Sequence, residues 1–136
     1  KWENLTKMVD YWVRPDVVAV IKKHEKYLLL NIANEAGDYS VKADQFKSGY
    51  QTAIKRIRGA GIKCPIVLDA SGWGQDIDIL QATGNFLINE DPLKNLPLSS
   101  RFLVYCVRMY SGTEQESHNN DQECDTSKLP GFHQPP

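Results

Sequence analysis

The stretch Tyr27-Leu28-Leu29-Leu30-Asn31-Ile32-Ala33-Asn34-Glu35 runs from apolar residues straight into an Asn-Glu pair. The run predicts a β-strand over residues 27–34, with Glu35 at its end. In parallel α/β barrels the residues at the C-terminal ends of the strands line the active site, where a glutamate can act as a general acid or base. The alternative is a solvated strand end followed by a turn at Gly37-Asp38. The rest of the chain separates these two interpretations.

The length and charge of the chain limit its class. Its 136 residues, 41% of them hydrophobic, suffice for one globular domain and are too few for two ordinary ones. A net charge of −1 and a pI near 6.3 provide neither a basic surface for nucleic acid nor a cationic face for membranes. The apolar runs are far shorter than the ~20 residues of a membrane span. We expect a soluble domain with neither partner.

The cysteines and the N-terminus give weaker indications. Cys64, Cys106 and Cys124 stand at spacings of 42 and 18 residues without a Cys-x-x-Cys pair, which predicts no metal site. A Cys106–Cys124 disulfide and three free thiols both stay open. The sequence has no signal-peptide pattern, so we expect a cytoplasmic chain or a leader outside it, and the start at Lys1 favours a fragment or processed product.

Helices are predicted where apolar residues recur at three- and four-residue intervals. They cover residues 2–13, 15–26, 44–59 and 77–83. Pro15 is tolerated as the first residue of the second helix, and Gly59 and Gly61 end the third. Residues 71–76 are predicted to form a loop, and Asp91-Pro92 a turn.

Strands are predicted at three continuous apolar runs, with a shorter extended piece besides. They cover residues 27–34, 65–69 and 102–107, and the extended piece covers 86–88. The alternation of helix and strand predicts an α/β fold with parallel strands joined by right-handed crossovers. Residues 111–136 carry five acidic side chains against Lys128 alone, which predicts a disordered or loosely packed tail after a domain of residues 1–110.

Five sequence blocks occur together in the order and approximate spacing found in one enzyme family. They are Asp10-Tyr11-Trp12, Asn31–Glu35, Tyr50–Gly61, Val67–Asp76 and Asp91–Asn95. Over roughly residues 2–110 the chain resembles glycoside hydrolase family 5, and most closely its bacterial-type endo-β-1,4-mannanases. The resemblance implies an α/β fold that forms part of a (β/α)8 TIM-barrel-like parallel sheet with flanking helices, covering about strands four to six.

The resemblance also implies a retaining two-carboxylate mechanism. Glu35 would be the general acid/base, and Asn34 would bind the sugar hydroxyl next to the scissile carbon. The second carboxylate, a nucleophile ~5–5.5 Å away, would belong to strand seven, which has no counterpart in the chain, so activity of this chain alone is not expected from the resemblance. No metal or organic cofactor is implied.

Further substrate-binding residues follow from the same blocks. Trp73 is a candidate sugar-facing aromatic because an indole can cover the apolar face of a pyranose, and Gln75 could bind hydroxyls. Packing of Trp73 within its loop is the alternative. Tyr110 matches the tyrosine of a His-x-Tyr pair that ends strand six in the family, whereas Arg108 replaces the histidine and cannot take over its donor-acceptor role. Asp69 ends its strand without a catalytic role implied.

These observations lead to three hypotheses. The favoured one is a secreted glycosidase domain that acts on β-1,4-linked polysaccharide, with mannan preferred and cellulose next. The second is a non-catalytic half-barrel that binds oligosaccharide, or that self-associates through unpaired strand edges at 27–34 and 102–107. The third, an unrelated α/β domain, would require the Trp73 loop and the Asn34-Glu35 edge to lie on opposite sides of the sheet.

Overall fold

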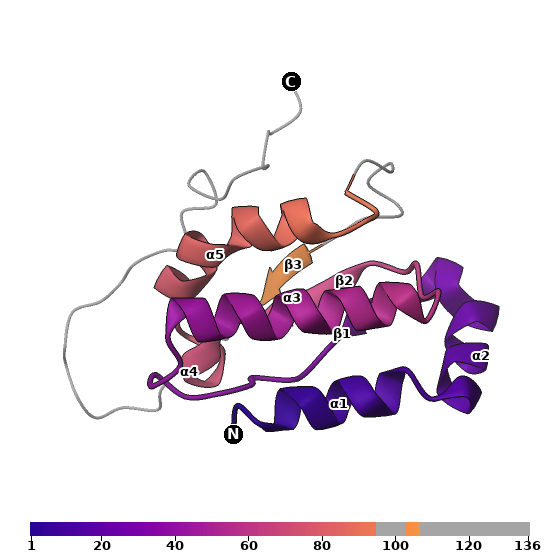
Figure 1. The fold of residues 1–136 in the computed structure, drawn as a ribbon, viewed down its shortest axis with the longest axis horizontal. Helices are drawn as coiled ribbons and strands as arrows, with labels where there is room; N and C mark the ends of the chain where they lie inside the picture. The colour runs from indigo at the N-terminus through magenta and orange to yellow at the C-terminus, as the bar shows by residue number, and fades with distance from the viewer. Residues whose placement is uncertain (95–102, 107–136) are drawn as a thin grey trace, which may run out of the picture.

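The computed structural model describes residues 1–94 and 103–106, which form helices and strands in alternation (Figure 1). The N-terminal elements are α1 (Asn4–Trp12), α2 (Pro15–His24), the 3-10 helix η1 (Glu25–Tyr27) and β1 (Leu30–Asn31). The later elements are α3 (Ala43–Gly59), β2 (Ile66–Asp69), α4 (Ser71–Gly74), α5 (Ile77–Glu90) and β3 (Leu103–Cys106). The predicted tail, 111–136, lies outside the described residues.

The three strands form one parallel sheet in the order β1-β2-β3. Leu30 pairs with Ile66 in register, and Ile66 pairs in turn with Leu103. Because α3 connects β1 to β2, and α4 and α5 connect β2 to β3, each parallel pair is joined through helix. The predicted α/β fold, a parallel sheet with flanking helices as in part of a TIM-barrel-like arrangement, is therefore confirmed.

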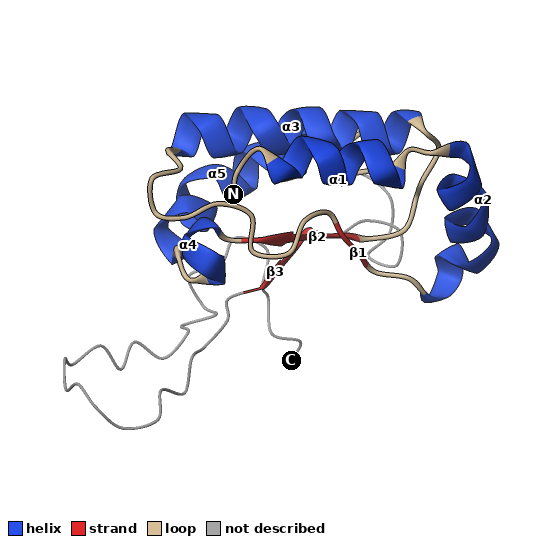
Figure 2. Cartoon of the chain, turned by 90° about the horizontal axis from the view of Figure 1, so that it is seen from below, coloured by secondary structure: helices blue, strands red, loops and turns tan. Residues whose placement is uncertain are grey.

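A layer of helices covers one face of the sheet. Helix α3 runs between α1 and α5 in Figure 1, and Figure 2 shows α1 and α3 on the same side of the strands. Helix α3 buries Phe46, Tyr50, Ile54 and Ile57, all 0% exposed. Their spacing of three and four residues is the pattern that predicted this helix, and burial of this apolar face holds the layer on the sheet.

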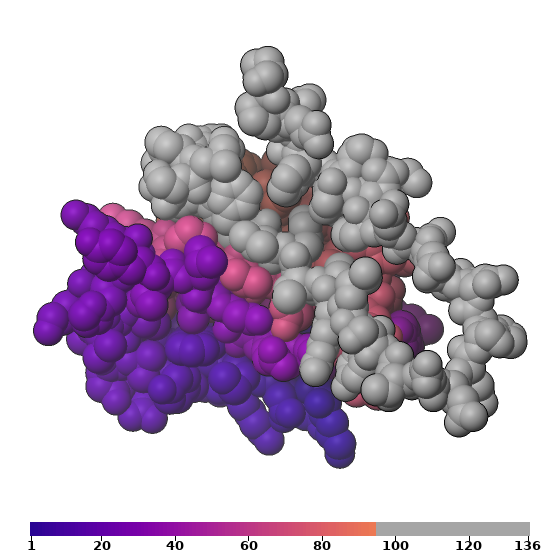
Figure 3. All heavy atoms as spheres, turned by 180° about the vertical axis from the view of Figure 1, so that it is seen from behind, coloured from indigo at the N-terminus to yellow at the C-terminus, as the bar shows by residue number. Residues whose placement is uncertain are grey.

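Helix α1 fixes the chain just after β1. Trp12 donates its indole Nε1–H to the backbone oxygen of Ile32 at 2.8 Å. Trp2, at the start of the same segment, stacks on Phe46 of α3 with ring centroids 5.7 Å apart. Seen from behind in Figure 3, the indigo and purple N-terminal residues form one continuous mass against the pink residues around β2. The segment that leads to Glu35 is thus bonded to α1, and the N-terminal segment is in turn packed on α3.

The predicted strand over residues 27–34 is wrong at both ends. Tyr27 belongs to η1, and the paired strand is limited to Leu30–Asn31. Within the described structure β1 has one neighbour, β2, and the ladder continues only as far as the Ile32 N–H, which donates to the Val67 oxygen at 3.3 Å. Asn34 and Glu35 therefore lie in a turn beyond the strand. An apolar run shows that a segment is buried, and its pairing depends on the neighbouring strand.

The extended piece predicted over residues 86–88 is also wrong, because α5 continues through it to Glu90. Leu80, Thr83, Gly84 and Leu87 are buried and keep helical spacing past residue 83. No proline occurs between Ile77 and Asp91, so nothing breaks the helix before Pro92. The loop predicted over 71–76 contains one short helical turn, α4.

The described residues contain no helix that is long and apolar enough to cross a membrane. Cys64 is a free, buried thiol, and burial raises its pKa. Cys124 lies outside the described residues, so the choice between a Cys106–Cys124 disulfide and free thiols stays a prediction.

Candidate active site

Glu35 lies in the turn that follows β1, at the C-terminal end of the sheet. Its backbone φ is +49°, in the left-handed region that residues with a side chain rarely adopt. Glu35 is half-buried and its neighbour Asn34 is exposed, whereas Ala33 and Ala36 on either side are buried. The local chain is thus held by the core while the Asn-Glu pair reaches the surface.

Asp69, the last residue of β2, is bonded directly to this turn. Its carboxylate accepts the Glu35 backbone N–H at 2.9 Å, and the Asn31 Nδ2 amide contacts both of its oxygens at 3.1 Å. Asp69 is 3% exposed. A hydrogen bond to a charged group contributes about 1.5–3 kcal/mol, whereas the left-handed conformation costs about 1–2 kcal/mol. The bond is therefore large enough to offset the strain at Glu35.

The Trp73 loop follows β2 and meets the Glu35 loop. The Trp73 backbone N–H donates to the Gly37 oxygen at 3.3 Å. Trp73 itself has φ +56°, and Gly72 has φ +61°. A Cβ at Gly72 would lie 2.6 Å from the Tyr39 ring, so only glycine fits beneath that ring. This close approach brings the two loops together at one end of the sheet.

Tyr39 is a site residue that the sequence analysis missed. Its ring meets Trp73 edge to face with centroids 5.8 Å apart, and its hydroxyl lies 3.3 Å from the Gln75 Oε1. Both rings are exposed, Tyr39 by 54% and Trp73 by 56%. The signal available in the sequence was an aromatic residue four positions after the candidate glutamate. Packing of Trp73 deep within its own loop, the alternative considered above, does not occur.

The loop between Glu35 and Tyr39 is ordered by its own side chains. Asp38 accepts hydrogen bonds from the Ser40 hydroxyl at 2.5 Å and from the Ser40 backbone N–H at 2.9 Å. These bonds, the hydroxyl first, lower the pKa of Asp38. The tight turn they form presents Tyr39 toward Trp73.

Within the described structure Glu35 and Trp73 are the non-glycine residues with positive φ. Such strained backbone is concentrated at active sites and ligand-binding sites, and an observed outlier is a reason to suspect function. The sequence selected the same two residues on other grounds. Two independent signals therefore coincide at this end of the sheet.

The third hypothesis, an unrelated α/β domain, required these loops to be on opposite sides of the sheet. The Trp73-to-Gly37 hydrogen bond excludes that arrangement. Of the predicted site residues, Asn34, Glu35, Trp73 and Gln75 are therefore brought to one region by the structure. Tyr110, like Arg108, lies outside the described residues.

Two buried polar atoms near Asp69 find no hydrogen-bond partner in the described structure. They are the Asn31 Oδ1 and the Tyr50 hydroxyl. Burial, with a smaller contribution from the Asp69 charge, raises the pKa of Tyr50. Tyr50 thus remains a neutral phenol beneath the site.

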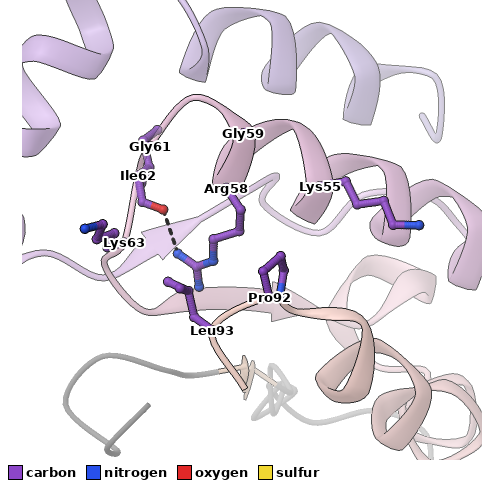
Figure 4. Close-up of a pocket in the computed structure, with 8 residues that line it drawn as sticks. All are labelled: Lys55, Arg58, Gly59, Gly61, Ile62, Lys63, Pro92 and Leu93. Atoms are coloured by element: carbon purple, nitrogen blue, oxygen red, sulfur yellow. Dashed lines mark hydrogen bonds between the residues drawn. The ribbon is translucent and has the colours of Figure 1, made fainter. Parts of the chain in front are cut away.

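A shallow pocket of about 300 Å³ lies at the opposite end of the sheet, between the end of α3 and the turn after α5 (Figure 4). Its central cation, Arg58, is 3% exposed and is bonded to Asp91 at 2.9 Å. Arg58 also donates to the backbone oxygens of Ile62 and Cys64. Each guanidinium nitrogen of Arg58 is already hydrogen-bonded. Arg58 therefore supports the local structure and has no nitrogen left to bind a ligand in this pocket.

Comparison with known proteins points to one family. The family model Cellulase (glycosyl hydrolase family 5) matches residues 3–133. A mannan endo-1,4-beta-mannosidase of Salipaludibacillus agaradhaerens is 35% identical over 105 residues, which are 75% of this chain and 32% of that protein. One from Cellvibrio japonicus is 31% identical over 108 residues, 79% of this chain and 23% of that protein.

Comparison of the fold with solved structures points to the same family. A solved β-mannanase from Thermomonospora fusca superposes with a TM-score of 0.63 at 30% identity, covering 78% of this chain and 33% of that one. A mannohexaose complex of the Thermomonospora fusca enzyme superposes equally well. The chain thus spans about a third or less of the length of these relatives. From its sequence match and its fold together, the chain belongs to glycosyl hydrolase family 5.

Proposed function

We propose that this chain forms the acid/base half of a retaining glycosidase site for β-1,4-linked mannan. Glu35 is the general acid/base, and Asn34 binds the hydroxyl beside the scissile carbon. The observation that carries the proposal is the hydrogen-bonded meeting of the Glu35 and Trp73 loops at the C-terminal end of a parallel sheet. That end is where barrel enzymes of this architecture hold their active sites.

The chemistry requires two carboxylates. A nucleophilic carboxylate attacks the anomeric carbon while Glu35 gives its proton to the departing glycosidic oxygen; Glu35 then takes a proton from the water that releases the sugar. Asp69 is unsuited to the nucleophilic role because it is buried and its oxygens accept bonds from Asn31 and Glu35. The nucleophile is expected on strand seven, as the resemblance implies, and outside the residues described.

The sugar-binding surface is proposed to be the exposed pair Tyr39 and Trp73 together with Gln75. The rings offer apolar faces to a pyranose, and the Gln75 amide, placed by the Tyr39 hydroxyl, offers hydrogen bonds to its hydroxyls. Tyr110 is retained as a fourth candidate. Mannan is preferred over cellulose because the relatives from Salipaludibacillus agaradhaerens and Cellvibrio japonicus are both named mannan endo-1,4-beta-mannosidase, while one from Caldicellulosiruptor saccharolyticus is named beta-mannanase/endoglucanase A. An extracellular location is proposed on the same grounds.

The test is hydrolysis by the chain and by Glu35→Gln, a substitution that keeps the shape and removes the acid. Each protein is incubated with galactomannan and with carboxymethylcellulose, and reducing ends are measured. If the wild-type chain releases reducing ends from galactomannan, the release should fall by about 10²-fold or more in the variant. Equal release by both proteins would refute the acid/base role.

The second candidate function is carbohydrate binding without turnover. The exposed Tyr39–Trp73 pair favours it, because this surface needs no nucleophile to bind sugar. Calorimetric titration of the chain with mannohexaose, together with the hydrolysis assay, distinguishes the two candidate functions. Binding by wild type with no reducing-end release by any protein supports this candidate over the first.

Self-association through the sheet edges is a separate proposal. Within the described structure β1 and β3 each pair on one side only, with β2. Unpaired edges can pair with another chain. A single monomeric species in sedimentation at high concentration would contradict it.

A further inference from the structure

We propose that Asp69 is a positioning residue for Glu35. Its buried carboxylate accepts the Glu35 backbone N–H and so holds the turn in the left-handed conformation that sets the direction of the Glu35 side chain. The catalytic consequence rests on the proposed acid/base role of Glu35, whereas the positioning itself can be measured without any activity.

Asp69 is supported by the most firmly paired part of the sheet. It ends β2, the central strand, which pairs with β1 on one side and with β3 on the other. Its own register partner is Cys106 of β3. Glu35, by contrast, lies in a turn four residues after the end of β1. The bond between them thus transfers the rigidity of a central strand to a turn residue 34 positions earlier in the chain.

The orientation of the Asp69 carboxylate is itself fixed from the neighbouring strand. Asn31, the last residue of β1, places its Nδ2 amide 3.1 Å from both carboxylate oxygens. The same carboxylate therefore accepts bonds from β1 and from the turn that follows it. With Asp69 3% exposed, water does not replace either bond readily.

Loss of the Asp69 carboxylate would change the backbone conformation of Glu35. A partly buried N–H would lose its bond to Asp69, and a non-glycine residue at φ +49° would lose the bond that offsets its strain. The turn should then relax toward negative φ, which rotates the Cα–Cβ bond and moves the carboxylate away from its original position. A bond made by the backbone thus controls where the side chain lies.

The chain offers a conservative variant that should preserve the bond. In Asp69→Asn the remaining side-chain oxygen can still accept the Glu35 N–H. The new amide group would face the Asn31 Nδ2, but the Asn31 Oδ1, which bonds to none of the residues that the structure describes, can accept from it once the Asn31 amide turns over. Asp69→Ala has no such compensation.

The experiment is NMR on the full isotope-labelled chain, comparing wild type with Asp69→Ala and Asp69→Asn. Thr83→Ala is the matched control, since Thr83 is buried and loses a side-chain bond to Ile79 in α5. In Asp69→Ala we expect the φ-sensitive coupling of Glu35 to change and its amide exchange protection to fall by about tenfold or more. Asp69→Asn and Thr83→Ala should keep both near wild type. Unchanged Glu35 signals in Asp69→Ala would overturn the proposal.

A second measurement decides the matter if Asp69→Ala does not fold. In wild type, a scalar coupling across the hydrogen bond should join the Glu35 amide nitrogen to the Asp69 carboxyl carbon, and the φ-sensitive coupling of Glu35 should correspond to a positive φ. Both should persist in Asp69→Asn. Absence of the coupling across the hydrogen bond in wild type, or a negative φ at Glu35, would overturn the proposal.

Hydrolysis adds an independent readout. If wild type cleaves galactomannan, Asp69→Ala should lower kcat by about tenfold or more with KM changed less than about twofold. Asp69→Asn should keep most of the wild-type kcat. Hydrolysis that Glu35→Gln leaves unchanged would refute the proposed function, and the NMR result would still decide whether Asp69 positions Glu35.

Discussion

The two ends of the parallel sheet differ in how completely their polar groups are satisfied. Near the start of β2, Arg58 is buried and each of its guanidinium nitrogens bonds to Asp91 or to a backbone oxygen. Near the end of β2, the Asn31 Oδ1 and the Tyr50 hydroxyl are buried and have no hydrogen-bond partner among the described residues. Positive φ at non-glycine residues occurs, within the described structure, only at this second end.

The difference shows a division between stability and function. At the first end Arg58 and Asp91 fasten a loop and a turn to α3, and the Arg58 guanidinium has no nitrogen left for a ligand. At the second end strain, unsatisfied atoms and exposed aromatic rings are retained, which stability alone would not favour. If this contrast is correct, substitutions at the first end should mainly lower stability, and substitutions at the second end should mainly weaken sugar binding.

The largest effect is expected at the first end. Arg58→Met should lower the free energy of unfolding by about 3–5 kcal/mol, because it leaves the Asp91 carboxylate buried without its partner. Urea unfolding followed by circular dichroism measures this. Asp16→Asn, which breaks the exposed pair with Arg14, should leave the urea midpoint unchanged. An Arg58→Met protein as stable as wild type would contradict the proposed difference between the two ends of the sheet.

Binding should depend on the second end. Trp73→Ala removes an exposed indole and should weaken mannohexaose binding by about tenfold or more, typical of the loss of an aromatic anchor. Calorimetric titration gives the dissociation constant. Tyr27→Ala, which removes an 88% exposed ring from η1, is the control and should bind as wild type does. Equal weakening by both substitutions would show that Trp73 has no special role.

Backbone strain at Trp73 can be tested by comparing the stabilities of its alanine and glycine variants. The usual order, in which alanine is the more stable, should be reversed at this position. Because Trp73 has φ +56°, Trp73→Gly should be about 1 kcal/mol more stable than Trp73→Ala. At the exposed α3 residue Thr52 the order should be the ordinary one, with Thr52→Ala the more stable by about 1 kcal/mol. Both pairs are compared by urea unfolding, and the same order at both positions would argue against stored strain.

The smallest effect concerns Tyr50. Tyr50→Phe removes a buried hydroxyl that has no hydrogen-bond partner in the described part of the chain, so stability near pH 7 should stay equal or rise by up to about 1 kcal/mol. Since the folded-state pKa of Tyr50 is raised, its contribution is complete below the unfolded value of about 10 and is lost as pH rises above it. The phenylalanine variant should therefore lose less stability between pH 9 and 11, as measured by urea unfolding. A steeper alkaline loss in the variant would contradict this.

Much of the fold could be predicted from local sequence pattern. The apolar spacing in α3 and the continuous run of β2 were recognised correctly, because a long amphipathic helix and a buried strand have strong periodic signals. Two errors in the predicted secondary structure had the same cause. The run ending in Glu35 and the continuation of α5 past Thr83 are both apolar, and composition alone does not distinguish paired strand, unpaired chain and helix.

The site was predicted in part. Glu35, Asn34, Trp73 and Gln75 came from motif resemblance, and the structure brings their loops together. Tyr39 was missed because an exposed tyrosine in a polar loop carries no periodic signal. The Asp69 bond to the Glu35 backbone was missed because it joins residues 34 positions apart through a donor that every residue possesses.

The sequence by itself determined the succession of helices and strands, the apolar faces that form the core, and the residue types available for chemistry. These follow from local propensity and hydrophobic periodicity, which act over a few residues. The tertiary structure alone decided where β1 ends, that Glu35 and Trp73 take left-handed backbone conformations, and that Asp69 bonds to the turn. Those features depend on which distant groups meet after folding, since a strained turn persists only where a buried partner compensates its cost.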